Sequence, residues 1–146
     1  MSTTLLNMTK GPTEGHFIAK ISGAQVFNAN TLYLGYSGDS LSLYGTDSDE
    51  DALLTSVNID VAGNIVSGTY EYKKHSDFRN VWVRYNGLPY IFVTESATLH
   101  ITANHSIKHA HGTCKITAVA FNDPDNRIIV EAAFDLKGGN GIPVSS

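Results

Sequence analysis

The sequence has little cysteine, few basic residues and no long apolar run, and each shortage excludes a class of protein. The single cysteine, Cys114, excludes an internal disulfide in this chain of 146 residues. Only ten Lys and Arg residues occur, they are not clustered, and the net charge is -4, which argues against a nucleic-acid surface or a polybasic membrane anchor. The longest apolar runs are too short to span a bilayer. We therefore expect neither a nucleic-acid partner nor a membrane span.

The start of the chain lacks the features of a secretion signal. Residues 1–16 have no basic segment leading into a long apolar run, and no lipoprotein cysteine follows. A cytoplasmic location is the simplest prediction, and export by a leaderless route is the alternative. With 42% hydrophobic and 16% charged residues, the composition is that of one globular domain with its own core.

Strand signals recur along the chain, whereas no segment has apolar residues at helical spacing over ten or more positions. Turn formers separate short stretches in which apolar and polar residues alternate, as at 37–40 and 122–126. The predicted strands are 16–21, 31–36, 41–44, 53–61, 65–72, 81–85, 90–94, 97–103, 112–121 and 127–136.

This pattern predicts an all-β fold, a single antiparallel β-sandwich of about eight to ten strands, with a closed antiparallel barrel as the alternative. The expected domain covers residues 15–136. Residues 1–14 and 137–146 are expected to be flexible tails.

Several histidines fall on two adjacent predicted strands. If Leu99 faces the core together with Cys114, the opposite face carries His100, His109 and His111. Three imidazoles on one face could hold a divalent transition metal such as zinc and leave a position open for water or substrate. No carboxylate lies nearby in sequence to support such ligands, so polar surface is the competing interpretation. Cys114 itself is expected to be a small buried hydrophobe.

An exposed aromatic surface is predicted around residues 82–90. Trp82 and Arg84 fall on the face opposite the apolar residues of their strand, and Tyr90 follows the turn at Asn86-Gly87. A Trp beside Arg offers a stacking plane and hydrogen-bond donors, which suit a sugar ring or a protein partner. The competing interpretation places Trp82 in the core.

Two further patterns suggest chemistry less specifically. Asp47, Asp49 and Asp51 alternate like the start of a calcium loop, but Ala52 and Asn58 stand where such a loop needs Gly and Glu, so a solvated acidic loop is favoured. The sequence contains no G-x-S-x-G motif for a nucleophilic serine and no phosphate-binding glycine motif in a strand–helix context.

Short motifs recur in order along the chain: F-x-A-x-I-x-G at 17–23, L-x-L-x-G-T at 41–46, G-T-Y at 68–70, L-x-I-T at 99–102, G-T-C at 112–114 and A-x-F at 132–134. This set resembles a group of small bacterial all-β domains that often occur as secreted lipoproteins and have no assigned activity. The resemblance implies a β-sandwich and supplies no catalytic residues, and the sequence departs from the group's usual pattern because residues 1–16 do not read as a lipoprotein leader.

Together these observations predict a non-catalytic binding module that meets a protein or a glycan-like ligand through Trp82, Arg84 and Tyr90. Long edge strands would need a cover, so a homodimer is also expected. The alternative is a small enzyme that uses the histidines as a metal site, or one whose site lies inside a barrel.

Overall fold

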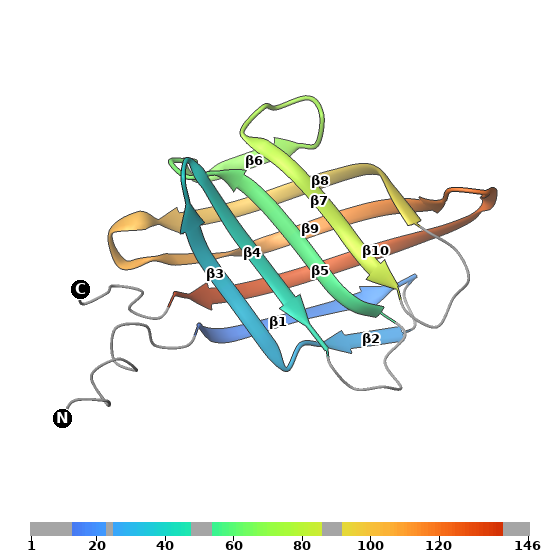
Figure 1. Ribbon diagram of the computed structural model, residues 1–146, viewed down its shortest axis with the longest axis horizontal. Coiled ribbons are helices and arrows are strands. Elements are labelled where there is room, and N and C mark those ends of the chain that lie inside the picture. Colours follow the sequence, from blue (N-terminus) through green and yellow to red (C-terminus); the bar gives the residue numbers. More distant parts are fainter. Residues whose placement is uncertain (1–12, 23–24, 48–53, 86–91, 139–146) are drawn as a thin grey trace.

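The chain folds as a two-layer β-sandwich in the computed structural model (Figure 1), which describes residues 13–22, 25–47, 54–85 and 92–138. Ten strands form two antiparallel sheets, one of six strands and one of four. The predicted all-β sandwich is confirmed. The barrel alternative is wrong, because the two sheets are separate and the strands at their edges do not close on one another.

The larger sheet has the strand order β2-β1-β10-β9-β8-β6. Its centre consists of the three longest strands, which are consecutive in sequence and pair as antiparallel neighbours. The strands of this sheet are β1 (Glu14–Ile21), β2 (Gln25–Asn28), β6 (Gly68–Glu71), β8 (Phe92–Asn104), β9 (His109–Ala120) and β10 (Asp123–Lys137).

The smaller sheet lies in front of the larger one in Figure 1 and has the strand order β3-β4-β5-β7. Its strands are β3 (Thr31–Ser37), β4 (Ser40–Thr46), β5 (Leu54–Ala62) and β7 (Phe78–Tyr85). The predicted turn at 37–40 joins β3 to β4, with Gly38 at φ +62°, where a glycine costs least.

One hydrophobic core fills the space between the sheets. Phe17 of β1 stacks on Phe134 of β10, with ring centroids 5.8 Å apart, and Leu43 and Ile59 of the smaller sheet belong to the same core. Gly45 of β4 permits a close approach to the larger sheet, because a Cβ at this position would lie 2.8 Å from Cβ of Phe17. The alternating residues of each strand therefore face either this core or solvent, as the sequence pattern predicts.

Strand β8 merges two predicted strands, 90–94 and 97–103. The pairing with β9 shifts between Thr94 and Ser96, so the chain continues through a β-bulge rather than a turn. The bulge changes which alternate residues face inward: Thr94 is buried before it and Ala97 after it. The predicted boundary was wrong because residues 95–96 contain no strong turn former.

Several other boundaries differ from the prediction, among them the starts of β7 at Phe78 and of β9 at His109, each three residues earlier than predicted. The turn expected at 122–126 is shorter: β10 begins at Asp123, and its pairing shifts between Asp123 and Arg127, which places the intervening residues in an irregular bulge. The strand predicted at 65–72 is limited to Gly68–Glu71. Strand β2 was not predicted, because four residues are too few to display an alternating pattern.

The described residues include one helical element, a 3-10 turn at His105–Ile107 between β8 and β9. No helix among them is long and apolar enough to cross a membrane. The predicted tails at 1–14 and 137–146 lie largely outside the described residues.

Candidate functional site

The outer face of the smaller sheet carries aromatic and polar side chains over its whole described area. Alternation places these residues outward, because their neighbours along each strand fill the core. None of the outward-facing residues that the structure describes on this face is aliphatic. They are Thr31, Tyr33, Gly35, Ser37, Ser40, Ser42, Tyr44, Thr46, Ser56, Asn58, Asp60, Asn80, Trp82 and Arg84.

Four of these residues form a line across the sheet, which we call the aromatic row: Tyr33, Tyr44, Asn58 and Trp82. Each is the direct pairing partner of the next on β3, β4, β5 and β7. The rings of Tyr33 and Tyr44 stack, with centroids 4.9 Å apart and planes inclined by 24°. Trp82 lies two strands beyond Tyr44, about 9.5 Å away at the usual strand spacing.

Gly35 provides the space in which the ring of Tyr33 lies. A Cβ at Gly35 would fall 2.2 Å from the Tyr33 hydroxyl oxygen and 2.5 Å from the ring carbon that carries it. The ring therefore leans along its own strand over the bare backbone of Gly35. In this position Tyr33 stacks on Tyr44 and still exposes 40% of its surface.

Polar groups fill the interval between the two aromatic ends of the row. Asn58 is only 7% exposed, and its amide nitrogen donates to Oδ2 of Asp60 at 3.3 Å. Ser42 donates to the other oxygen of Asp60 at 2.7 Å. Along β5 in the other direction, the hydroxyls of Thr46 and Ser56 are 3.2 Å apart. The row therefore has fixed hydrogen-bonding groups on both sides of its stacking surfaces.

Arg84 lies two residues beyond Trp82 on the same face, exposed and opposite Ser56. It has no ion pair or hydrogen bond with any carboxylate that the structure describes. The other two arginines of the chain, Arg79 and Arg127, are both paired. Arg84 is therefore distinct among the three.

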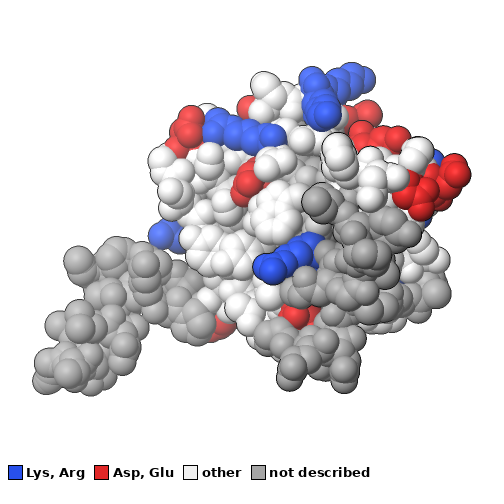
Figure 2. Space-filling model, turned by 45° about the vertical axis from the view of Figure 1, so that its right-hand side comes forward, with Lys and Arg blue, Asp and Glu red and all other residues white. Residues whose placement is uncertain are grey.

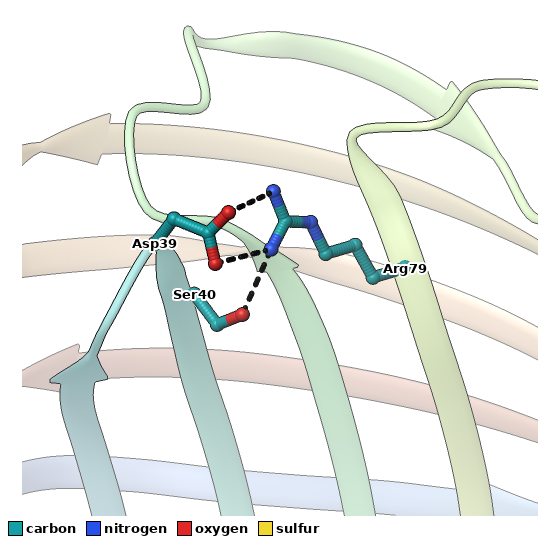
Figure 3. Close-up of polar contacts among 3 residues, drawn as sticks. All are labelled: Asp39, Ser40 and Arg79. Atoms are coloured by element: carbon teal, nitrogen blue, oxygen red, sulfur yellow. Dashed lines mark hydrogen bonds and ion pairs between the residues drawn. The ribbon is translucent and has the colours of Figure 1, made fainter.

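Arg79 is paired within the protein by hydrogen bonds to neighbouring side chains (Figure 3). Its Nη1 donates to Oδ1 of Asp39 at 3.0 Å and to Oγ of Ser40 at 2.9 Å, and its Nη2 lies 3.4 Å from Oδ2 of Asp39. These bonds hold the pKa of Asp39 below its ordinary value. Arg79 thus ties the tip of the β3–β4 hairpin to the start of β7.

Arg127 is engaged on the other sheet. Its Nε and Nη2 donate to the two oxygens of Glu95 at 3.0 and 2.9 Å, a two-bond fork that holds the pKa of Glu95 below its ordinary value.

Figure 2 shows the surface turned by 45° from the view of Figure 1. Most of the acidic and basic side chains lie towards the upper edge of this view, and one basic side chain lies near the centre beside a group of uncharged atoms.

The residues predicted for the binding surface have different outcomes. Trp82 and Arg84 lie on the outer face together, and Trp82 keeps 42% of its surface exposed, so the competing core interpretation is wrong. Tyr90 lies outside the described residues. Tyr33 and Tyr44 were not predicted, although their alternation with leucines and the tight turn at 37–40 contain enough information to pair them.

The predicted histidines lie on the outer face of the larger sheet. Leu99 pairs with Cys114 and both are buried, which confirms the register inferred from the sequence. Nδ1 of His100 is 2.9 Å from the hydroxyl of Thr69 on β6, whereas the rings of His109 and His111 are 5.4 Å apart.

A carboxylate on β10 joins these histidines. Nε2 of His109 donates to Oδ1 of Asp135 at 2.7 Å, and Asp135 pairs directly with His111 on one side and with His16 of β1 on the other. The hydrogen bond from His109 and the nearby histidines hold the pKa of Asp135 below its ordinary value. The sequence did not suggest this contact, because Asp135 is 26 residues from His109.

Within the described ranges, no group of three or more His, Cys, Asp or Glu side chains is arranged to hold a metal ion. Residues 48–53, which include most of the predicted acidic loop, lie outside those ranges.

Cys114 is buried as predicted, with 1% of its surface exposed. Burial raises the pKa of its thiol to about 12, so the thiolate needed for nucleophilic attack is scarce at neutral pH.

No family model, no curated protein and no solved structure matches this chain.

Proposed function

We propose that this protein is a non-catalytic binding module that recognises a glycan-like ligand on the outer face of its four-stranded sheet. The observation that carries the proposal is the aromatic row, in which Tyr33 and Tyr44 form one stacking surface and Trp82 forms another. The faces of sugar rings are apolar and pack on aromatic rings, while their hydroxyls need polar partners at the sides. This face offers both.

A glycan fits this face better than a protein partner does. Tyr, Trp and Arg also anchor protein–protein interfaces, so the preference for a glycan rests on the polar side chains that surround the rings on this face. Asp60, which is only partly buried and is held by Asn58 and Ser42, provides a carboxylate whose remaining acceptor positions can bond to sugar hydroxyls. A protein ligand is the competing outcome.

The test is a glycan array probed with the purified protein, followed by titration of each binder. Trp82 is the only tryptophan in the chain, so its fluorescence reports directly on this face in every variant that retains it, and calorimetry follows binding by Trp82→Ala. We expect Trp82→Ala and Tyr44→Ala to weaken binding about tenfold or more, as is typical of a central aromatic anchor. Phe121→Ala is the matched control, because Phe121 is 76% exposed but lies at the β9–β10 turn, away from the row.

All variants should keep the circular dichroism spectrum of the original protein. Binding that resists both row substitutions, or no binding to any glycan on the array, would overturn the proposal.

Kinship with the small bacterial all-β domains named above remains part of this proposal, supported by motifs that begin or lie within strands β6, β8 and β9. A homodimer and a cytoplasmic location remain predictions. The smaller sheet ends in strands of seven and eight residues, β3 and β7, which are long enough to pair with a second chain. Light scattering at several protein concentrations tests the dimer.

A further inference from the structure

We infer that the glycan bound by the aromatic row carries a carboxylate, as uronic and sialic acids do, and that Arg84 binds it. The inference rests on the proposed function and adds the charge of the ligand to it. It follows from the position of Arg84, its lack of a described partner and the arrangement of polar groups around it.

The first argument is the contrast between Arg84 and the other arginines. Arg79 and Arg127 both use their guanidinium forks on carboxylates within the protein. Arg84 is exposed on a sheet face, and none of the carboxylates in the described ranges bonds to it. A guanidinium group matches a carboxylate through two parallel hydrogen bonds, so a guanidinium fork that has no carboxylate partner among the described residues and lies beside a stacking surface suits an acidic ligand.

The second argument concerns the one described carboxylate among the outward residues of this face. Asp60 pairs with Asn80, whereas Arg84 pairs with Ser56, four residues away on β5. At the usual rise per strand residue, this places the backbone positions of Asp60 and Arg84 about 13 Å apart along the strands. That distance exceeds the screening length of about 8 Å at physiological salt, so Asp60 does little to neutralise Arg84.

The third argument is that the two charges lie on opposite sides of the aromatic row. Asp60 already accepts hydrogen bonds from Ser42 and Asn58, which makes its side of the row suited to neutral hydroxyls. The side with Arg84, Thr46 and Ser56 offers hydroxyls and a cation. A sugar stacked on Trp82 would thus direct its acidic group towards Arg84 and its hydroxyls towards Asp60.

The experiment uses matched acidic and neutral polymers with the full-length protein. Polygalacturonate and its fully methyl-esterified form share one backbone and differ in charge, and the glycan array adds uronic-acid and sialic-acid glycans beside their carboxyl-reduced forms. Binding is followed by Trp82 fluorescence and by calorimetry. The variants are Arg84→Gln, Arg84→Lys and Lys115→Gln, the last being an exposed cation on the larger sheet that controls for net charge.

We expect Arg84→Gln to bind acidic glycans about ten- to a hundredfold more weakly than the original protein does. This loss of affinity corresponds to the usual free energy of hydrogen bonds to a charged group. Arg84→Lys should recover only part of this loss, because an ammonium cannot form the two-bond fork. Lys115→Gln should bind like the original protein.

Equal binding of the acidic and neutral members of a pair, unchanged in Arg84→Gln but lost in Trp82→Ala, would overturn this inference and leave the proposed function standing. Failure to bind any glycan would overturn both.

Discussion

Tyr33 stacks on Tyr44 across the β3–β4 hairpin, and the stack depends on the missing side chain of Gly35. The ring of Tyr33 occupies the space where a Cβ on Gly35 would stand, with the hydroxyl oxygen 2.2 Å from that position. One glycine therefore helps to set the orientation of one end of the aromatic row.

Substitution of Gly35 by alanine should have opposite effects in two backgrounds. In the original protein we expect Gly35→Ala to lower the free energy of unfolding by about 0.5–1.5 kcal/mol, because the exposed ring of Tyr33 must turn away and give up its stack on Tyr44. In a Tyr33→Ala background the same change should raise the free energy of unfolding by about 0.4–1 kcal/mol, because alanine lowers the conformational entropy of the unfolded chain. Urea unfolding of the four proteins measures both effects, and additive changes would contradict this account.

A close contact between the two sheets can be tested at Gly45. A Cβ there would lie 2.8 Å from Cβ atoms of Phe17 and Ala29, so Gly45→Ala should destabilise the protein by about 1–3 kcal/mol. Gly68→Ala is the matched control, because the nearest atom to its new Cβ would be 3.7 Å away. Equal urea midpoints for the two variants would contradict this prediction, because they would show that the sheets can move apart at Gly45 with no loss in the free energy of unfolding.

The contact between His109 and Asp135 should contribute to stability in a pH-dependent way. Asp135 has a pKa below its ordinary value of 3.8, chiefly because His109 donates a hydrogen bond to it. A carboxylate with a lowered folded-state pKa stabilises the protein above its unfolded-state pKa. That contribution is lost as the pH falls through the folded-state value.

We therefore expect the Asp135→Asn variant to have a lower urea midpoint than the original protein near neutral pH, and the two midpoints to converge as the solution is acidified below pH ~4. Because both partners are partly exposed, the difference should be modest. Glu131→Gln, on the same strand and face, serves as the control. A difference that persists unchanged at pH ~2 would contradict the role given to this carboxylate.

The predicted zinc site can be tested by thermal unfolding of protein stripped with EDTA. His100 and His109 already contact Thr69 and Asp135, and the described side chains contain no cluster suited to a metal. We expect added zinc to leave the melting temperature unchanged. A metal present at a hundred times its dissociation constant would stabilise the fold by about 2.7 kcal/mol, which is easily detected. A shift that disappears in a His109→Ala, His111→Ala variant would restore the metal hypothesis.

Much of the architecture follows from the sequence, because alternation is a local property. Ile128, Val130 and Ala132 face the core since every second residue of a strand points the same way. The same logic, counted back from the tight turn at 37–40, pairs Tyr33 with Tyr44. Local pattern could not show that 92–94 and 97–103 form one strand, because a bulge depends on how a neighbouring strand pairs.

What the sequence determined by itself is the all-β class, most of the strands and the outward position of Trp82 and Arg84. Only the tertiary structure decided that Trp82 completes a row with Asn58 and Tyr44, and that Asp135 meets His109. The physical reason is that alternation fixes the face of a side chain within its own strand. Its neighbours across the sheet depend on which strands pair. Strands β5 and β7 are neighbours in the smaller sheet, although β6, which lies between them in sequence, belongs to the larger sheet.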